Sequence, residues 1–139
     1  MDEKELALVK ARADADDPNA MLVYAEYMKS VNQAESDKYI LLAAHLGQPQ
    51  AAEKYGDICH AHGDYETATH FYKRGARAGL VDCSVKLAVM RLTVDEHSSL
   101  RELEELAESG VKSACSALAA YYKSQGNRKE ANFWKSLVK

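Results

Sequence analysis

Residues that break helices or favour strands are scarce in this chain of 139 residues. Proline occurs twice, threonine three times and isoleucine twice, whereas alanine, the strongest helix former, occupies 22 positions. This composition predicts an all-α protein. No apolar run approaches the roughly 18 residues that mark a membrane-spanning helix, so we expect no insertion into a membrane.

Cysteine pairs and an export signal are also missing. Cys59, Cys83 and Cys115 are odd in number and lack the Cys-x-x-Cys spacing of redox or metal motifs, so we expect reduced thiols. Residues 1–5 include three acids at a place where an export signal carries basic residues. These absences predict a cytoplasmic protein. Its net charge of −3 argues against general nucleic-acid binding.

Motifs for catalysis and for cofactors are lacking as well. The sequence contains no Gly-x-Ser-x-Gly, no glycine-rich phosphate-binding loop and no His-Glu-x-x-His. Acids such as Glu104, Glu105 and Glu108 fall together on a predicted helix, where a run of charge is usually a solvated face. We therefore expect a protein that is not an enzyme and needs no cofactor or metal ion.

What the chain does contain is a pattern that occurs four times at intervals of 31 or 32 residues. Each copy starts at an anchor residue, which is followed by a small residue four positions later, a bulky one at eight and a small one at nine. The anchors are Asp16, Gly47, Gly79 and Gly110. Glycine readily adopts the left-handed conformation that ends a helix, so each anchor predicts a helix boundary. A second break inside each repeat, clearest at Gly63-Asp64 and Gly126-Asn127, predicts two helices per repeat.

The repeats predict one domain, 1–139, built from four helix pairs and a leading half-repeat. The half-repeat covers residues 3–15, and the repeats cover about 16–46, 47–78, 79–109 and 110–139. Small residues at constant positions let neighbouring helices approach closely, while the bulky residues fill the remaining space. We expect helices at about 3–13, 19–31, 36–46, 50–62, 65–78, 81–93, 98–109, 112–125 and 128–138.

The pattern Gly-x-x-x-Ala-x-x-x-[Tyr/Leu]-[Gly/Ala], followed by a helix that ends in Ala-x-x-Gly, resembles the Sel1-like repeat, a branch of the tetratricopeptide superfamily. The resemblance covers nearly the whole chain and is clearest at 43–56 and 68–76. Two departures are the absence of extra glycine-containing residues between the helices, and Leu100 at the site that matches Ala68 and Ala131. The resemblance implies a right-handed α-α superhelix, a solenoid whose concave surface binds other proteins and carries no catalytic residues.

A candidate protein-binding groove follows from helical geometry. If Tyr24, Tyr55, Leu87 and Leu118 face the core, other residues of the first helices point to the concave side. These residues are Leu22, Glu26, Lys29, Glu53, Asp57, His60, Val85, Val89, Ser116, Ala120 and Lys123. The set is acidic in its first half and apolar in its middle. It therefore predicts a protein or peptide partner that carries basic and apolar side chains.

Two other functions stay open at this point. Cys59 and His62 lie three residues apart on one predicted helix, but a structural zinc ion needs four ligands, usually as two close pairs, and one pair is visible. Nucleic-acid binding would use the last repeat, where residues 111–139 carry six basic side chains and one acidic side chain. The basic residues are Lys112, Lys123, Arg128, Lys129, Lys135 and Lys139.

The same basic repeat allows two simpler interpretations. One is a terminal repeat whose polar outer face prevents further stacking. The other is weak head-to-tail self-association, in which this basic end meets the acidic start of another copy.

Overall fold

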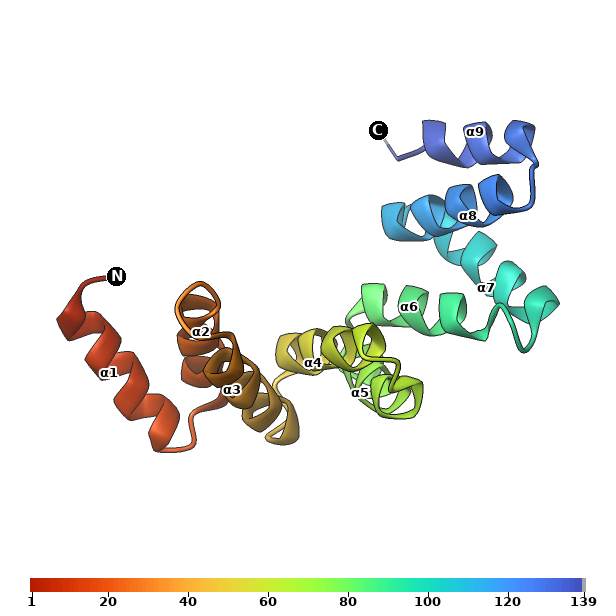
Figure 1. Cartoon of the computed structure of the whole chain (residues 1–139). Helices are drawn as coiled ribbons and strands as arrows, with labels where there is room; N and C mark the ends of the chain where they lie inside the picture. The colour runs from red at the N-terminus through yellow and green to blue at the C-terminus, as the bar shows by residue number, and fades with distance from the viewer. Residues whose placement is uncertain (139) are drawn as a thin grey trace. The chain divides into compact units, whose positions relative to one another are not determined.

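The computed structural model describes residues 1–138, and within that range the chain forms nine helices and no strand (Figure 1). Lys139, one of the basic residues named above, lies outside the described residues. The prediction of an all-α chain is confirmed. The helices are α1 (Glu3–Asp14), α2 (Pro18–Met28), α3 (Gln33–His45), α4 (Pro49–Ala61), α5 (Tyr65–Arg77), α6 (Val81–Arg91), α7 (Glu96–Glu108), α8 (Lys112–Ser124) and α9 (Arg128–Ser136).

The helices start where side chains can accept hydrogen bonds from the free backbone N–H groups of the first turn. At the mid-repeat breaks, Asp64 Oδ1 accepts from the Thr67 N–H at 3.2 Å and Asn127 Oδ1 accepts from the Glu130 N–H at 3.2 Å. Both prolines, Pro18 and Pro49, occupy the first position of a helix. There a missing N–H costs nothing, so neither proline interrupts the helical pattern.

The anchors of the repeat end helices as predicted. Gly47, for example, has a φ of 90°, and its N–H donates to the carbonyl of Ala44 at 3.1 Å. Asp16, which replaces glycine in the first repeat, has a φ of 65° in the same left-handed region. A side chain other than glycine is uncommon there, although aspartate tolerates it better than most residues. The backbone at this anchor therefore follows the repeat even without glycine.

The chain divides into two compact units, the first from Met1 to Leu80 and the second from Val81 onwards. The first unit contains α1 to α5 around a core that includes Tyr24, Tyr39 and Phe71. The rings of Tyr24 and Tyr39 meet edge to face with centroids 4.9 Å apart. The Tyr39 hydroxyl donates to Asp14 Oδ1 at 2.7 Å, and this bond together with burial raises the pKa of Tyr39 to about 12.

The second unit packs α6 to α9 around a separate apolar cluster. Leu103 and Leu118 are fully buried in it, and Trp134 lies beside them. The structure corrects one repeat alignment here. Because α7 is capped by Asp95 and begins at Glu96, Ser99 occupies the buried site that matches Ala68 and Ala131, and Leu100 lies one position further along. A small side chain is thus kept at this site in all four repeats.

Candidate functional site

Most of the predicted groove residues are accessible in the structure. Glu26, Asp57, Val89 and Ala120 lie at the same position of the four first helices, and all four are exposed. The residues three positions further along, Lys29, His60 and Lys123, are exposed as well, as is Ser116. Leu22 and Glu53 are half-buried.

Val85 is a correction to the predicted groove. Its side chain is 5% exposed and packs with Ala88, Leu103 and Leu118 in the core of the second unit. Leu22, Glu53 and Ser116 share its position in the other repeats, and their exposure ranges from half-buried to exposed. This position lies at the edge of the core, where an apolar side chain is drawn inward because its burial is favourable. Val85 therefore does not belong to the candidate binding surface.

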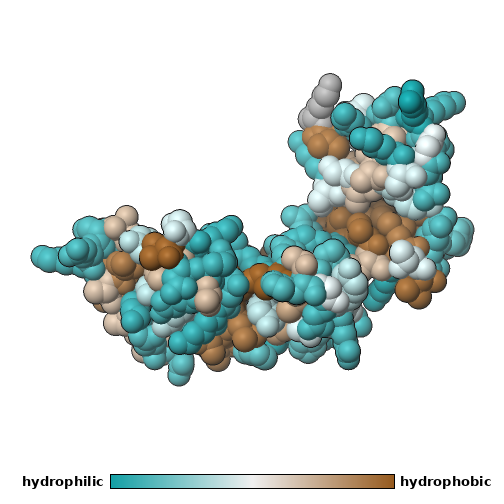
Figure 2. Space-filling model, in the orientation of Figure 1, coloured by the Kyte–Doolittle hydropathy of each residue, from teal (hydrophilic) through white to brown (hydrophobic). Residues whose placement is uncertain are grey.

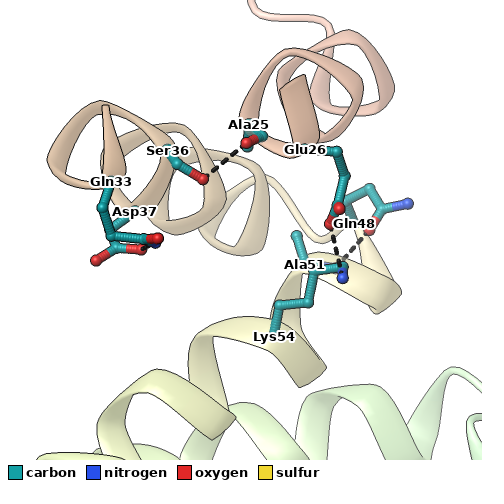
Figure 3. Close-up of polar contacts among 8 residues, drawn as sticks. All are labelled: Ala25, Glu26, Gln33, Ser36, Asp37, Gln48, Ala51 and Lys54. Carbon is teal, nitrogen blue, oxygen red and sulfur yellow. Dashed lines mark hydrogen bonds and ion pairs between the residues drawn. The ribbon is translucent and has the colours of Figure 1, made fainter. Parts of the chain in front are cut away.

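In the first unit, α2, α3 and α4 meet around a small hollow of about 210 Å³ (Figure 3). It brings together three predicted groove residues, Glu26, Lys29 and Asp57. Lys54 Nζ lies 2.7 Å from Glu26 Oε1, and its hydrogen bond lowers the pKa of that carboxyl (Figure 3). Glu26 is thus engaged by a lysine of the next repeat.

Asp57 also has a partner inside the first unit. Its Oδ1 accepts a hydrogen bond of 2.5 Å from the hydroxyl of Tyr72, whose ring is buried. Asp57 therefore helps to join α4 to α5. The sequence shows that Asp57 and Tyr72 lie on consecutive helices, but helical periodicity alone does not reveal that their side chains meet. The acidic half of the predicted groove is partly occupied by the protein's own contacts.

The second unit carries an apolar hollow of about 710 Å³, lined by Val89, Leu92, Val94, Ala117, Ala120 and Tyr121. Figure 2 shows apolar side chains gathered over this part of the surface, where α6 lies near α8. Val94 is 87% exposed and Val89 is 41% exposed. We call this surface the apolar hollow. Its size is in the range of ligand and peptide pockets, and contiguous exposed apolar patches often mark interaction sites.

Polar side chains also line the apolar hollow, namely Thr93, Glu96, Ser124 and Gln125. Glu96 lies at its edge, and a hydrogen bond to this carboxylate raises the pKa of Tyr121. Sequence analysis missed Leu92, Val94 and Tyr121 as site residues, although it placed Val89 and Ala120 there. The available signal in the sequence was Val94, an apolar residue in the turn directly before the Asp95 cap.

A second groove of about 570 Å³ lies between α8 and α9. We call it the end groove. It collects three predicted residues, Ser116, Ala120 and Lys123. The others include Arg128, Ala131, Asn132 and Lys135 of α9, and Val138, which follows that helix. Its charged lining residues, Lys123, Arg128 and Lys135, are all cationic. Three of the six basic residues named for the last repeat therefore line this groove.

The structure does not assemble ligands around Cys59 and His62. Cys59 is buried, and burial raises the pKa of its thiol, which disfavours the thiolate that binds metals. The Nδ1 of His62 lies 2.8 Å from the carbonyl oxygen of Ile58. The histidines of the adjoining helices, His45 of α3 and His70 of α5, pack their rings against Phe71. Over residues 1–138, no group of three or more His, Cys, Asp or Glu side chains is placed to hold a metal ion.

Among the residues that the structure describes, no helix has both the length and the apolar character needed to cross a bilayer.

The fold is similar to that of a solved protein, c5321, a protective antigen present in uropathogenic Escherichia coli strains displaying an SLR (Sel1-like repeat) fold. The TM-score is 0.71 at 23% sequence identity. The match covers 96% of this chain and 32% of that protein, so this chain spans about a third of its length. No protein-family model and no curated protein sequence matches the chain. The chain therefore has the Sel1-like repeat fold, an α-solenoid of helix pairs.

Proposed function

We propose that this chain is a non-enzymatic scaffold or adaptor that binds a segment of another protein, and that the apolar hollow of the second unit is its main binding site. The observation that supports this is the exposure of Val89 and Val94, with Tyr121 half-buried beside them, around a hollow large enough for one or two side chains. Burying such apolar surface contributes about 25 cal/mol per Å², so an apolar anchor residue supplies most of the affinity.

The partner segment is proposed to carry a basic side chain beside its apolar anchor. Glu96 lies at the edge of the apolar hollow, where a lysine or arginine next to the anchor reaches it. In the first unit, the hollow at Glu26, Lys29 and Asp57 is smaller and already contains the Lys54–Glu26 ion pair. That hollow is therefore the weaker of the two candidates. Electrostatic complementarity of this kind selects partners more than it adds affinity.

A peptide-display selection on the full chain tests this proposal. The selected peptides are expected to combine a large apolar residue with a neighbouring lysine or arginine. Their affinity for the purified protein is then measured by fluorescence anisotropy. Val94→Asp and Tyr121→Ala are each expected to weaken binding about tenfold or more, because both remove apolar contacts at the anchor. Glu96→Gln is expected to weaken the binding of peptides that carry the basic residue.

Val31→Asp is the matched control. Val31 precedes the Asn32 cap of α3 just as Val94 precedes the Asp95 cap of α7, and it is 64% exposed, but it lies outside the apolar hollow. Binding is expected to stay within about twofold of wild type in this variant. Equal losses for Val31→Asp and Val94→Asp, or a selection that yields no apolar anchor, would contradict the proposed site.

The two other functions have less support. For metal binding through Cys59 and His62, the described residues do not bring together a set of ligands. Nucleic-acid binding would depend on the end groove. In the rest of the chain, however, the net charge of each repeat is neutral or negative. A continuous basic track is the usual requirement for such binding.

A further inference from the structure

The end groove corresponds, position by position, to a surface that is covered inside the first unit. The cap of α9, Asn127, matches the cap of α3, Asn32, and Ala120 and Lys123 on α8 match Glu26 and Lys29 on α2. In the first unit, the residues at these positions line the hollow beneath α4 and are Glu26, Lys29, Gln33, Ser36, Asp37 and Ile40. In the last repeat, the matching residues line the open end groove and are Ala120, Lys123, Arg128, Ala131, Asn132 and Lys135.

The covered surface shows what kind of element fits this position. A whole helix, α4, lies against it, and Lys54 of α4 pairs with Glu26 (Figure 3). Ser36 beneath it is buried and donates to the carbonyl of Ala25 at 2.7 Å, which keeps α2 and α3 close (Figure 3). The end groove has the same floor of small residues, Ala119 and Ala131, and is therefore shaped to receive one helix.

The charges of the end groove define the helix that it accepts. The eighth residue after the cap of the second helix is Ile40, Tyr72 or Leu103 in the first three repeats, and each of these is buried. In the last repeat it is Lys135, which is exposed. Lys123 and Arg128 flank it. The incoming helix therefore needs a narrow face of small or apolar residues with acidic side chains around it.

Helix α1 has these properties. Leu6, Val9 and Ala13 face the core of the first unit, whereas Ala7, Leu8, Ala11 and Ala15 lie on the opposite side and are exposed. Leu8 is 55% exposed. Residues 2–17 carry six acidic and three basic side chains, so the segment that contains α1 is complementary in charge to the end groove.

We propose that the end groove of one molecule binds α1 of a second copy, so that a helix covers this groove as α4 covers the matching surface of the first unit. The two surfaces involved are different, and such a heterologous contact forms open chains or rings rather than a closed symmetric dimer. The exposed apolar face of α1 supplies the buried surface. The pairing of its acidic side chains with Lys123, Arg128 and Lys135 fixes the orientation of the bound helix. This inference does not depend on the proposed peptide site.

Sedimentation velocity on the full chain tests the proposal. The weight-average sedimentation coefficient of the wild type is expected to rise with protein concentration and to fall when salt screens the ionic contacts. Lys135→Glu removes a groove cation, and Ala11→Arg places a bulky cation on the α1 face. Both side chains are exposed, so both variants are expected to fold, and each alone is expected to weaken association about tenfold or more.

Mixing the two variants gives the decisive result. Lys135→Glu retains an intact α1 face and Ala11→Arg retains an intact end groove, so an equimolar mixture is expected to form a 1:1 dimer that grows no further. Lys129→Glu on α9 and Ala61→Arg on α4 are matched controls, since both residues are exposed and neither lines the end groove. They are expected to associate like the wild type.

Three outcomes would overturn the proposal. If the wild type stays monomeric at every concentration, the end groove is only a polar surface that prevents further stacking. Association that survives both Lys135→Glu and Ala11→Arg would place the contact on another surface. A mixture of the two variants that remains monomeric would show that α1 and the end groove are not partners.

Discussion

Small residues decide how closely the helices of a repeat approach, and Gly56 is the tightest case. A Cβ atom at Gly56 would lie 2.6 Å from Cε1 of Tyr72. The Tyr72 ring is buried and its hydroxyl is bonded to Asp57, so it has little freedom to move away. The other repeats place Ala25, Ala88 and Ala119 at the same position. Glycine is therefore required in the second repeat because a tyrosine packs against it.

Gly56→Ala is expected to lower the free energy of unfolding by up to about 2 kcal/mol. Alanine gains about 1 kcal/mol in helix propensity, but overpacking against a fixed ring costs about 1–3 kcal/mol or more. Chemical denaturation followed by circular dichroism measures the change. In a Tyr72→Leu background the clash is removed, and the same substitution is expected to stabilise the protein. A stabilising effect in the wild-type background would show that the Tyr72 ring moves freely.

At the scale of the element, the start of each helix depends on which group accepts hydrogen bonds from the backbone N–H groups of its first turn. Aspartate, asparagine or glutamine side chains cap α1 to α5, α7 and α9. Helix α8 differs, because Val111 stands at its cap position and makes no side-chain hydrogen bond there. Val111 packs against the core of the second unit instead. Burial thus replaces capping at the start of this helix.

Asp64→Ala is expected to destabilise the protein by about 0.5–2 kcal/mol, because the Thr67 N–H loses its acceptor at the start of α5. Thermal unfolding measures the effect. The comparison variant is Glu66→Ala, which removes an acid from the same first turn without touching the cap and is expected to cost less than about 0.5 kcal/mol. Equal costs for the two variants would assign the effect to charge rather than to the cap.

At the scale of the whole molecule, the chain contains two cores rather than one. The buried residues of the first unit and those of the second form separate apolar clusters. In repeat proteins, stability is approximately a sum of local terms, so a cavity is felt most strongly in its own neighbourhood. A core substitution is therefore expected to destabilise the unit that contains it more than the other unit.

Leu118→Ala is expected to cost about 2–5 kcal/mol, since this side chain is fully buried and its removal leaves a cavity. The single tryptophan, Trp134, belongs to the same cluster and reports the transition by its fluorescence. Hydrogen exchange is expected to accelerate more in residues 81–138 than in residues 1–80. The control Leu42→Ala truncates a leucine that is 39% exposed and is expected to cost less than about 1 kcal/mol. Uniform acceleration along the chain would indicate a single cooperative unit.

The sequence by itself determined the all-helical composition, the period of the repeats and most helix ends to within two residues. The exceptions are the end of α2, expected at 31 and found at Met28, and the start of α3, expected at 36 and found at Gln33. Alanine content, the left-handed anchors at Asp16 and Gly47, and the capping residues act within a few positions of the chain. Local rules of this kind can be read without knowing which helices are neighbours. Glu26, Val89 and Lys123, which helical geometry placed away from the core, are exposed.

Only the tertiary structure decided what those exposed positions do. Val85 turned inward because its neighbours on α7 and α8 complete an apolar core around it, and Glu26 and Asp57 met Lys54 and Tyr72 on other helices. Contacts between helices depend on the side chains of both partners, whereas periodicity describes one helix at a time. The same reason explains why the apolar hollow and the end groove emerged only after the helices were assembled.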